Sequence, residues 1–116
     1  MADPPAVLKA FMNRMAQGKI EKAYELVAPS SKKNGDPIAY KTPLDLASFR
    51  RELEGKGYSD GEFPFPKFAN YRVGKQRQQT KDIFRILIHM GGDNDEAMIV
   101  REQGRWYIAD PVHIIR

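Results

Sequence analysis

The chain contains no cysteine, and this absence removes several kinds of site at once. Disulfides, thiolate metal sites and a cysteine nucleophile all require that side chain. Histidine is scarce too, since only His89 and His113 are present, and two imidazoles do not make a tight transition-metal site. The sequence therefore predicts no metal ion and no cofactor.

Long hydrophobic runs and familiar catalytic motifs are also missing. No stretch approaches the ~20 apolar residues that cross a membrane, and no phosphate-binding GxxxxGK loop, GxSxG elbow or HExxH helix is present. The start, MADPPAVLKAFMNRM, lacks the basic and apolar regions of a signal peptide. We expect a cytoplasmic protein as the sequence stands, or an exported one if a leader has been removed.

The length and the net charge of the chain indicate how many domains it has and which partners it favours. A length of 116 residues predicts one domain, residues 1–116, with a single core. The net charge of +4 mildly favours anionic partners but falls short of a nucleic-acid signature. The densest basic segment, with Lys75, Arg77 and Lys81, has no interleaved aromatic residues that would stack on bases. A solvated hairpin end explains it better than nucleic-acid binding.

The first half of the chain predicts three helices. The first is capped by Asp3 and ends at Gly18. Its apolar side chains share one face: Val7, Leu8, Phe11, Met12 and Met15. A second helix follows directly and is stopped by Pro29, and residues 30–40 form a loop. The third helix begins at a capping box in which Thr42 is the cap.

The second half predicts an antiparallel meander of strands. The expected strands run over residues 68–78, with a bulge at Gly74, and over residues 82–90, 96–102 and 105–115. The dipeptide Gln103-Gly104 forms a two-residue hairpin turn between the last two. Helices followed by a meander of strands predict an α+β fold with the helices on one face of the sheet.

This order of elements resembles the nuclear transport factor 2-like superfamily, which has a cystatin-like α+β fold. The resemblance covers nearly the whole chain and depends on three segments: QGKIEKAYELVAPSS, TPLDLASFRREL and the terminal QGRWYIADPV. It implies three N-terminal helices packed on a curved sheet that forms a cone with a pocket. Some members, such as ketosteroid isomerase, polyketide cyclases and scytalone dehydratase, place acid–base residues in that pocket. Others only bind a small molecule or a protein, and many small bacterial relatives are exported accessory domains.

Asp110 is the first candidate for a catalytic residue. In an extended strand it shares a face with Trp106 and Ile108, which would point its carboxyl into the cone. A carboxyl at the end of an apolar strand loses water, its pKa rises, and it can act as a general acid or base. The alternative is a half-exposed residue that shapes the bend before Pro111.

His89 is the second catalytic candidate, because it lies on the more polar face of the strongest strand and histidine titrates near neutrality. His113 is a further candidate proton carrier, and both could equally be surface groups. The predicted ligand-binding residues are aromatic: Tyr24, Tyr40, Tyr58, Phe65 and Trp106. The alternative for Tyr24 is a core residue with a satisfied hydroxyl, and the others could simply fasten a loop or the core.

The residues favour a non-catalytic domain that binds an apolar small molecule or another protein. No convergent set of ionisable groups is visible, and the expected pocket mouth is aromatic. The alternative is a small isomerase, cyclase or dehydratase that uses acid–base residues in the pocket on an apolar substrate. We also expect a homodimer through the sheet, because Ile83 and Leu87 alternate with Ile86 and Ile88, and one of the two faces needs a partner.

Overall fold

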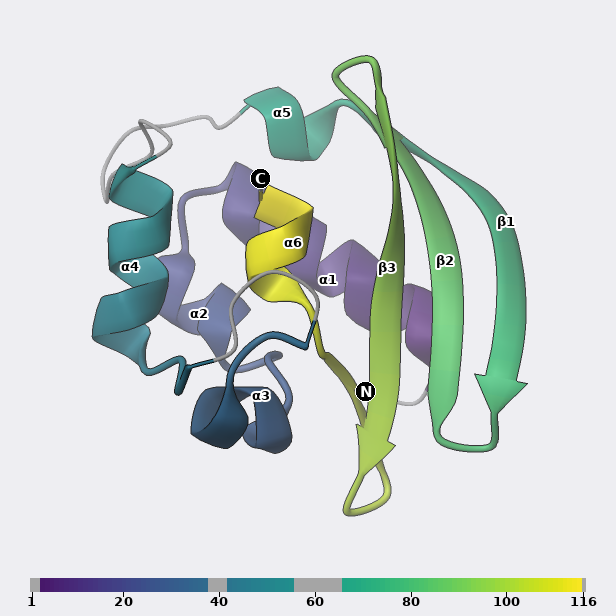
Figure 1. Ribbon diagram of the computed structural model, residues 1–116. Helices are drawn as coiled ribbons and strands as arrows, with labels where there is room; N and C mark the ends of the chain where they lie inside the picture. Colours follow the sequence, from purple (N-terminus) through teal and green to yellow (C-terminus); the bar gives the residue numbers. More distant parts are fainter. Residues whose placement is uncertain (1–2, 38–41, 56–65, 116) are drawn as a thin grey trace.

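The computed structural model describes residues 3–37, 42–55 and 66–115, and its helices lie on one side of a curved sheet (Figure 1). The helices are α1 (Pro4–Ala16), α2 (Ile20–Tyr24), α3 (Pro29–Asn34), α4 (Leu46–Glu54), α5 (Pro66–Ala69) and α6 (Pro111–Ile115). The strands are β1 (Tyr71–Thr80), β2 (Ile83–Met90), β3 (Asp93–Glu102) and β4 (Arg105–Ile108). They form one antiparallel sheet in the order β1-β2-β3-β4. The α+β class and the meander are confirmed, but the helices are more numerous than the three predicted.

The first predicted helix is confirmed as α1. The Asp3 carboxylate accepts the N–H of Ala6 at 2.9 Å, and Pro4 occupies the first helical position, where a missing N–H costs nothing. The predicted apolar face is fully buried. Gly18 follows the helix with a φ of 70°, which allows the chain to turn sharply into α2.

The second helix ends earlier than predicted, at Tyr24, and Pro29 begins α3 instead of stopping α2. Residues 26–28 between the two helices run beside β4 as a short parallel partner. There the N–H of Ile108 donates to the carbonyl of residue 26, and its carbonyl accepts from the N–H of residue 28, both at 2.8 Å. This non-local pairing withdraws the segment from α2.

The third predicted helix is confirmed as α4, but its cap is Asp45 and not Thr42. The Asp45 carboxylate accepts the N–H of Ser48 at 2.7 Å. Leu44 is buried, and its N–H donates to the carbonyl oxygen of Lys32 at 2.9 Å. Because this bond and burial hold Leu44 outside the helix, α4 cannot begin at the capping box.

The sheet confirms the predicted bulge, turn and alternation. The pairing of β1 with β2 shifts between Val73 and Gln76, on either side of Gly74. Gln103 and Gly104 both have positive φ, 53° and 76°, as a two-residue hairpin turn requires. Residues 66–69 form α5, and for this reason β1 starts at Tyr71 and not at residue 68.

The two faces of the sheet differ in burial. The inner face, toward α1 and α6 in Figure 1, carries the buried side chains Ile86, Ile88, Met90, Ala97, Ile99 and Ile108. The outer face carries the half-buried side chains Ile83, Arg85, Leu87 and His89. The inner side chains pack with those of α1 into the main core.

The last predicted strand is wrong beyond Ile108. The chain leaves the sheet, and the terminal residues form the short helix α6, whose Val112, Ile114 and Ile115 are buried. Pro111 has no N–H to give to a sheet ladder and is suited to the first position of a helix. A short apolar run such as this one carries no period that separates strand from helix.

Candidate functional site

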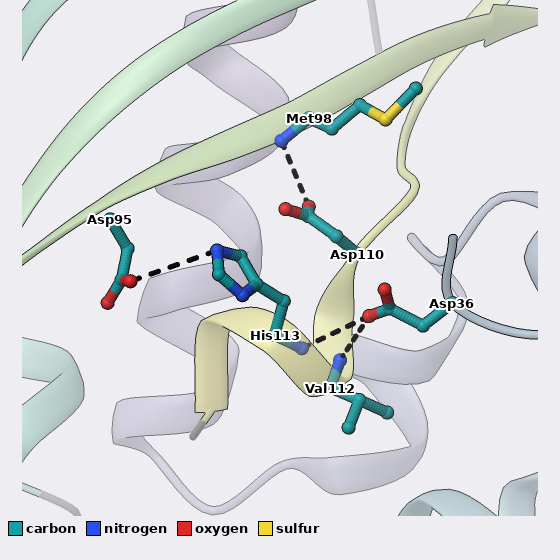
Figure 2. A network of polar contacts seen from close by, with 6 residues as sticks. All are labelled: Asp36, Asp95, Met98, Asp110, Val112 and His113. Atoms are coloured by element: carbon teal, nitrogen blue, oxygen red, sulfur yellow. Dashed lines mark hydrogen bonds and ion pairs between the residues drawn. The ribbon is translucent and has the colours of Figure 1, made fainter. Parts of the chain in front are cut away.

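Four ionisable side chains gather where α6 meets β3 and the loop after α3, and we call this group the α6 cluster (Figure 2). Its members are Asp36, Asp95, Asp110 and His113. Asp36 and Asp110 are 0% exposed, whereas Asp95 and His113 are half-buried. Ionisable groups without solvent are costly unless they are hydrogen-bonded or neutral, so the contacts of each decide what the cluster can do.

The side chain of Asp110 accepts a hydrogen bond from β3 at the point where the backbone carbonyls of β4 no longer do so. The β3–β4 ladder reaches the bond from the N–H of Ala109 to the carbonyl of Met98, at 2.9 Å. The carbonyl of Ala109 then turns to the hydroxyl of Ser31 (2.7 Å), and the N–H of Met98 is bound by Asp110 Oδ1 at 3.0 Å. The second carboxyl oxygen of Asp110, Oδ2, is buried and has no hydrogen-bond partner within the described ranges.

Asp36 caps α6 from a position 76 residues away in the chain. Its Oδ2 accepts the N–H groups of Val112 (3.0 Å) and His113 (3.1 Å), the donors that a local cap residue would otherwise satisfy. Figure 2 shows both bonds converging on this one oxygen. Asp36 carries no sequence signal as a cap, because the helix whose N–H groups it binds lies far away in the chain. A cap supplied across the fold leaves no spacing signal.

The environment of Asp110 changes its proton affinity. Burial raises the pKa of Asp110 well above its usual value, and the nearby carboxylate of Asp36 raises this pKa further. The hydrogen bond from Met98 and the positive charge of Arg85 oppose the rise. The carboxyl therefore keeps its proton to a higher pH than an ordinary aspartate. Its complete burial also excludes the half-exposed alternative.

The backbone and the ring of His113 contact different members of the cluster. Its N–H binds Asp36, while ring Nε2 lies 3.8 Å from Oδ1 of Asp95 on the inner face of β3. Both side chains are partly exposed.

His89 lies elsewhere, on the outer face of the sheet. Its ring Nδ1 is hydrogen-bonded to Oδ1 of Asn94, its register partner on β3, and a Cβ added to Gly74 would lie 2.8 Å from Nε2. Asn94 is four residues, or about 13 Å, along β3 from the Met98 N–H that binds Asp110. The structure therefore does not bring His89 and Asp110 together as an acid–base pair.

The predicted aromatic ligand-binding residue Tyr24 makes structural contacts. Its hydroxyl donates to the carbonyl of Leu44 at 2.8 Å, and the ammonium of Lys32 lies 4.4 Å from the ring centroid. Burial raises the pKa of Tyr24, and the negative charge of Asp45 adds to the rise. These contacts tie α2 to α3, through Lys32, and to the segment that precedes α4, through Leu44.

Of the four remaining aromatic candidates, only Trp106 lies among the described residues. Trp106 is half-buried against the main core, and the guanidinium carbon of Arg101 lies 5.4 Å from its ring centroid. Tyr40, Tyr58 and Phe65 lie outside the described residues.

An open cleft lies between the α5–β1 junction and the β2–β3 turn. It has a volume of about 610 Å³ and is lined by residues 69–72 and 89–94. Its side chains mix Arg72 and His89 with Asp93 and the apolar Met90. This mixture has no single charge and does not single out one class of ligand.

Comparison with protein-family models, with curated proteins and with solved structures found no match. Within the described ranges, no group of three or more histidine, aspartate or glutamate residues is placed to hold a metal ion. No helix in the same ranges is long and apolar enough to cross a membrane. The resemblance to the nuclear transport factor 2-like superfamily stays a prediction.

Proposed function

We propose that this chain is a non-catalytic interaction domain, with a nuclear transport factor 2-like fold, that pairs with a second copy through the outer face of its sheet. One observation carries the proposal. The outer face holds four half-buried apolar side chains, which we call the outer patch: Ile83, Leu87, Met98 and Tyr107. In Figure 1, helices α1, α2, α4, α5 and α6 all lie on the opposite side of the sheet. An apolar face of this kind is typical of a protein–protein contact.

The charges around the outer patch favour a second copy as the partner. The strands β1 and β2 contribute the basic side chains Arg72, Arg77 and Arg85. Strand β3 contributes Glu96, which is paired with Arg77 at 3.0 Å, and Glu102, which lies beside Arg105 of β4. A twofold axis parallel to the strands places the basic half of one copy opposite the acidic half of the other. Such complementary halves set the orientation of a symmetric contact.

The close packing of the inner face supports a binding role for the outer face of the sheet. Side chains of α1 and α6 fill the space against the sheet, and Phe11, Met12, Met15, Val112 and Ile114 are at most 1% exposed. A face packed to this degree belongs to the core. Apolar side chains that stay accessible on this inner face lie toward its edges, such as Val73 on β1 and Trp106 on β4, whereas those of the outer patch lie on β2, β3 and β4.

Sedimentation equilibrium at micromolar concentration tests the proposal. The unaltered chain should have the mass of two chains, and Leu87→Glu should have the mass of one, because it places a charge inside the contact. Asn13→Glu, which adds the same charge on the exposed side of α1, is the matched control and should remain dimeric. Circular dichroism shows that each variant is folded. A single-chain mass for the unaltered protein at every concentration overturns the proposal.

A second candidate function is acid–base catalysis of the isomerase, cyclase or dehydratase type on an apolar substrate. It is favoured by the buried carboxyl of Asp110, which has a raised pKa and an unpartnered oxygen. Proton NMR of apolar enolisable ketones in heavy water provides a test. Catalysed deuterium exchange that is lost in Asp110→Asn supports this function, and exchange at the uncatalysed rate removes it.

A further inference from the structure

The open cleft between the α5–β1 junction and the β2–β3 turn, at the top of Figure 1, has charges that the strand register sorts by face. Arg72, His89 and Asn94 are partners across β1, β2 and β3 and share the outer face. The neighbouring row, which includes Met90 and Asp93, belongs to the inner face. The mixed lining therefore has a basic outer side and an acidic inner side, and its volume of about 610 Å³ suits a small molecule.

Within the described ranges, the guanidinium of Arg72 has no ion pair and no hydrogen bond. Two other arginines on this face are engaged. On β1, Nη2 of Arg77 lies 3.0 Å from Oε1 of Glu96. On β2, Arg85 donates to the side-chain oxygen of Gln79 at 2.8 Å. The exposed guanidinium of Arg72 is thus available to bind a carboxylate through two parallel N–H···O bonds.

The ring of His89 is held opposite Arg72 with one nitrogen uncovered. Its Nδ1 is hydrogen-bonded to Oδ1 of Asn94, and because an amide oxygen only accepts, Nδ1 carries the hydrogen. The other nitrogen, Nε2, lies over β1, where a Cβ added to Gly74 would be 2.8 Å from it. Gly74 is two residues from Arg72, so the absent side chain leaves Nε2 open near the guanidinium. A glycine inside a strand often marks a place where a ligand approaches closely.

We propose that Arg72 and His89 bind the carboxylate group of a small organic acid whose remaining atoms lie in the cleft. Arg72 supplies a positive charge and two donors. Nε2 of His89 supplies a third donor when the ring takes up a proton from solvent. The carboxylate of Asp93 on the inner side repels a doubly charged phosphate more than a singly charged acid. One chain makes the whole site, which does not depend on pairing with a second copy.

The groups around His89 set the direction of the pH effect. On β3, Asp93 lies in the cleft, and Glu96 is occupied by its ion pair on the outer face. On β1, burial raises the pKa of Tyr71 further above neutrality, so this phenol stays uncharged. Protonated His89 and Arg72 are two cations directly opposite each other, and a bound carboxylate offsets their repulsion. Because histidine titrates near neutrality, carboxylate binding should tighten as pH falls from 8 to 6.

An NMR titration with sodium butyrate tests the site, and butyramide, which has a similar shape without the charge, is the control ligand. The amide signals of residues 70–72 and 89–94 should shift to saturation with butyrate and stay in place with butyramide. Arg72→Gln should weaken butyrate binding about tenfold, because a charged hydrogen-bonding group is lost. Arg105→Gln removes the same charge at the opposite end of the sheet and should leave binding unchanged.

Two further variants examine the part played by His89. Gly74→Ala keeps every charge and should weaken butyrate binding several-fold, since the added Cβ covers Nε2. His89→Gln should abolish the tightening of butyrate binding between pH 8 and pH 6 and leave binding at pH 8 nearly unchanged, because the ring is then mostly neutral. Butyrate itself remains ionised throughout this range.

Four results overturn the proposal. The first is the absence of a saturable shift around the cleft with butyrate, or an equal shift with butyramide. The second is an equal loss in Arg72→Gln and Arg105→Gln, which would show that anions follow only the net charge. The third is tightening at low pH that persists in His89→Gln. The fourth is inorganic phosphate that binds at pH 8 more tightly than butyrate, which would contradict the preference for a single negative charge.

Discussion

On the inner face of the sheet, β2 contributes Ile86 and Ile88, which are buried, whereas on the outer face it contributes Leu87 and His89, which are half-buried. Asp110, which follows β4, contacts no solvent either, whereas Asp95 on the inner face of β3 is half-buried. The outer face leaves its polar groups accessible beside apolar ones. Asp110, the acid with a raised pKa, is therefore shielded from solvent, whereas the half-buried side chains of the outer face are accessible for contact.

The largest expected difference between the faces concerns neighbouring residues of β2. Ile86→Ala should lower the free energy of unfolding by about 2–5 kcal/mol, because it leaves a cavity in the core. Leu87→Ala should lower it by only about 1 kcal/mol, since the side chain keeps part of its solvent contact in the single chain. Urea denaturation at low protein concentration measures both values. Equal losses would contradict the assignment of inner and outer faces.

The next effect concerns pH and the buried acid of the inner face. The raised pKa of Asp110 means that the folded chain binds this proton more tightly than the unfolded chain does. Stability from this group is fully present below pH 3.8 and is lost as pH rises through the folded pKa. Asp110→Asn should remove this loss and be more stable than the unaltered chain at high pH. Denaturation midpoints in a pH series that run parallel for the two proteins would show that Asp110 is not the group responsible.

A smaller effect separates the two aspartates that cap helices. Asp36→Ala should cost about 1–3 kcal/mol, because two buried N–H groups of α6 lose their acceptor. Asp3→Ala removes an exposed cap with one bond and should cost about 0.5–1 kcal/mol. Thermal unfolding of both variants at one pH provides the comparison. A larger loss for Asp3→Ala would contradict the capping role of Asp36.

The smallest effect belongs to the outer face. In Gly74→Ala the added Cβ would lie 2.8 Å from His89 Nε2 and 3.2 Å from Leu87 Cδ2, so the two side chains must move. Both are accessible enough to rotate, and we expect a cost of about 1 kcal/mol or less. The NMR signals of the His89 ring should shift in this variant, while those of His113 should not. Unchanged His89 signals would show that the ring does not lie over Gly74.

The parts of the fold that were predicted correctly are those with local signals. The cap at Asp3, the turn at Gln103-Gly104 and the alternation along β2 depend on residues that are neighbours in the chain. Each of these patterns corresponds to one backbone conformation without help from distant segments. For this reason α1 and the meander follow from the sequence with small errors at their ends.

The parts that were missed depend on contacts between distant residues. The segment after Asp110 is apolar enough for a strand or a helix, and Asp36 decides between them by binding the first N–H groups of α6. Likewise, pairing with Ile108 removes residues 26–28 from α2. The sequence offers Asp110 either as a desolvated acid or as a half-exposed bend residue, and its bond to Met98 and its nearness to Asp36 could be known only from the fold.

Methionine oxidation tests the difference between the two faces most directly. Met12 and Met15 are 0% exposed in the core, whereas Met98 is half-buried in the outer patch. Mass spectrometry after dilute peroxide, at a series of protein concentrations, gives the rate for each residue. We expect Met12 and Met15 to be protected throughout, and Met98 to oxidise quickly in dilute protein and more slowly as copies pair. Oxidation of Met12 at the rate of Met98, or a Met98 rate that does not depend on concentration, would contradict the account.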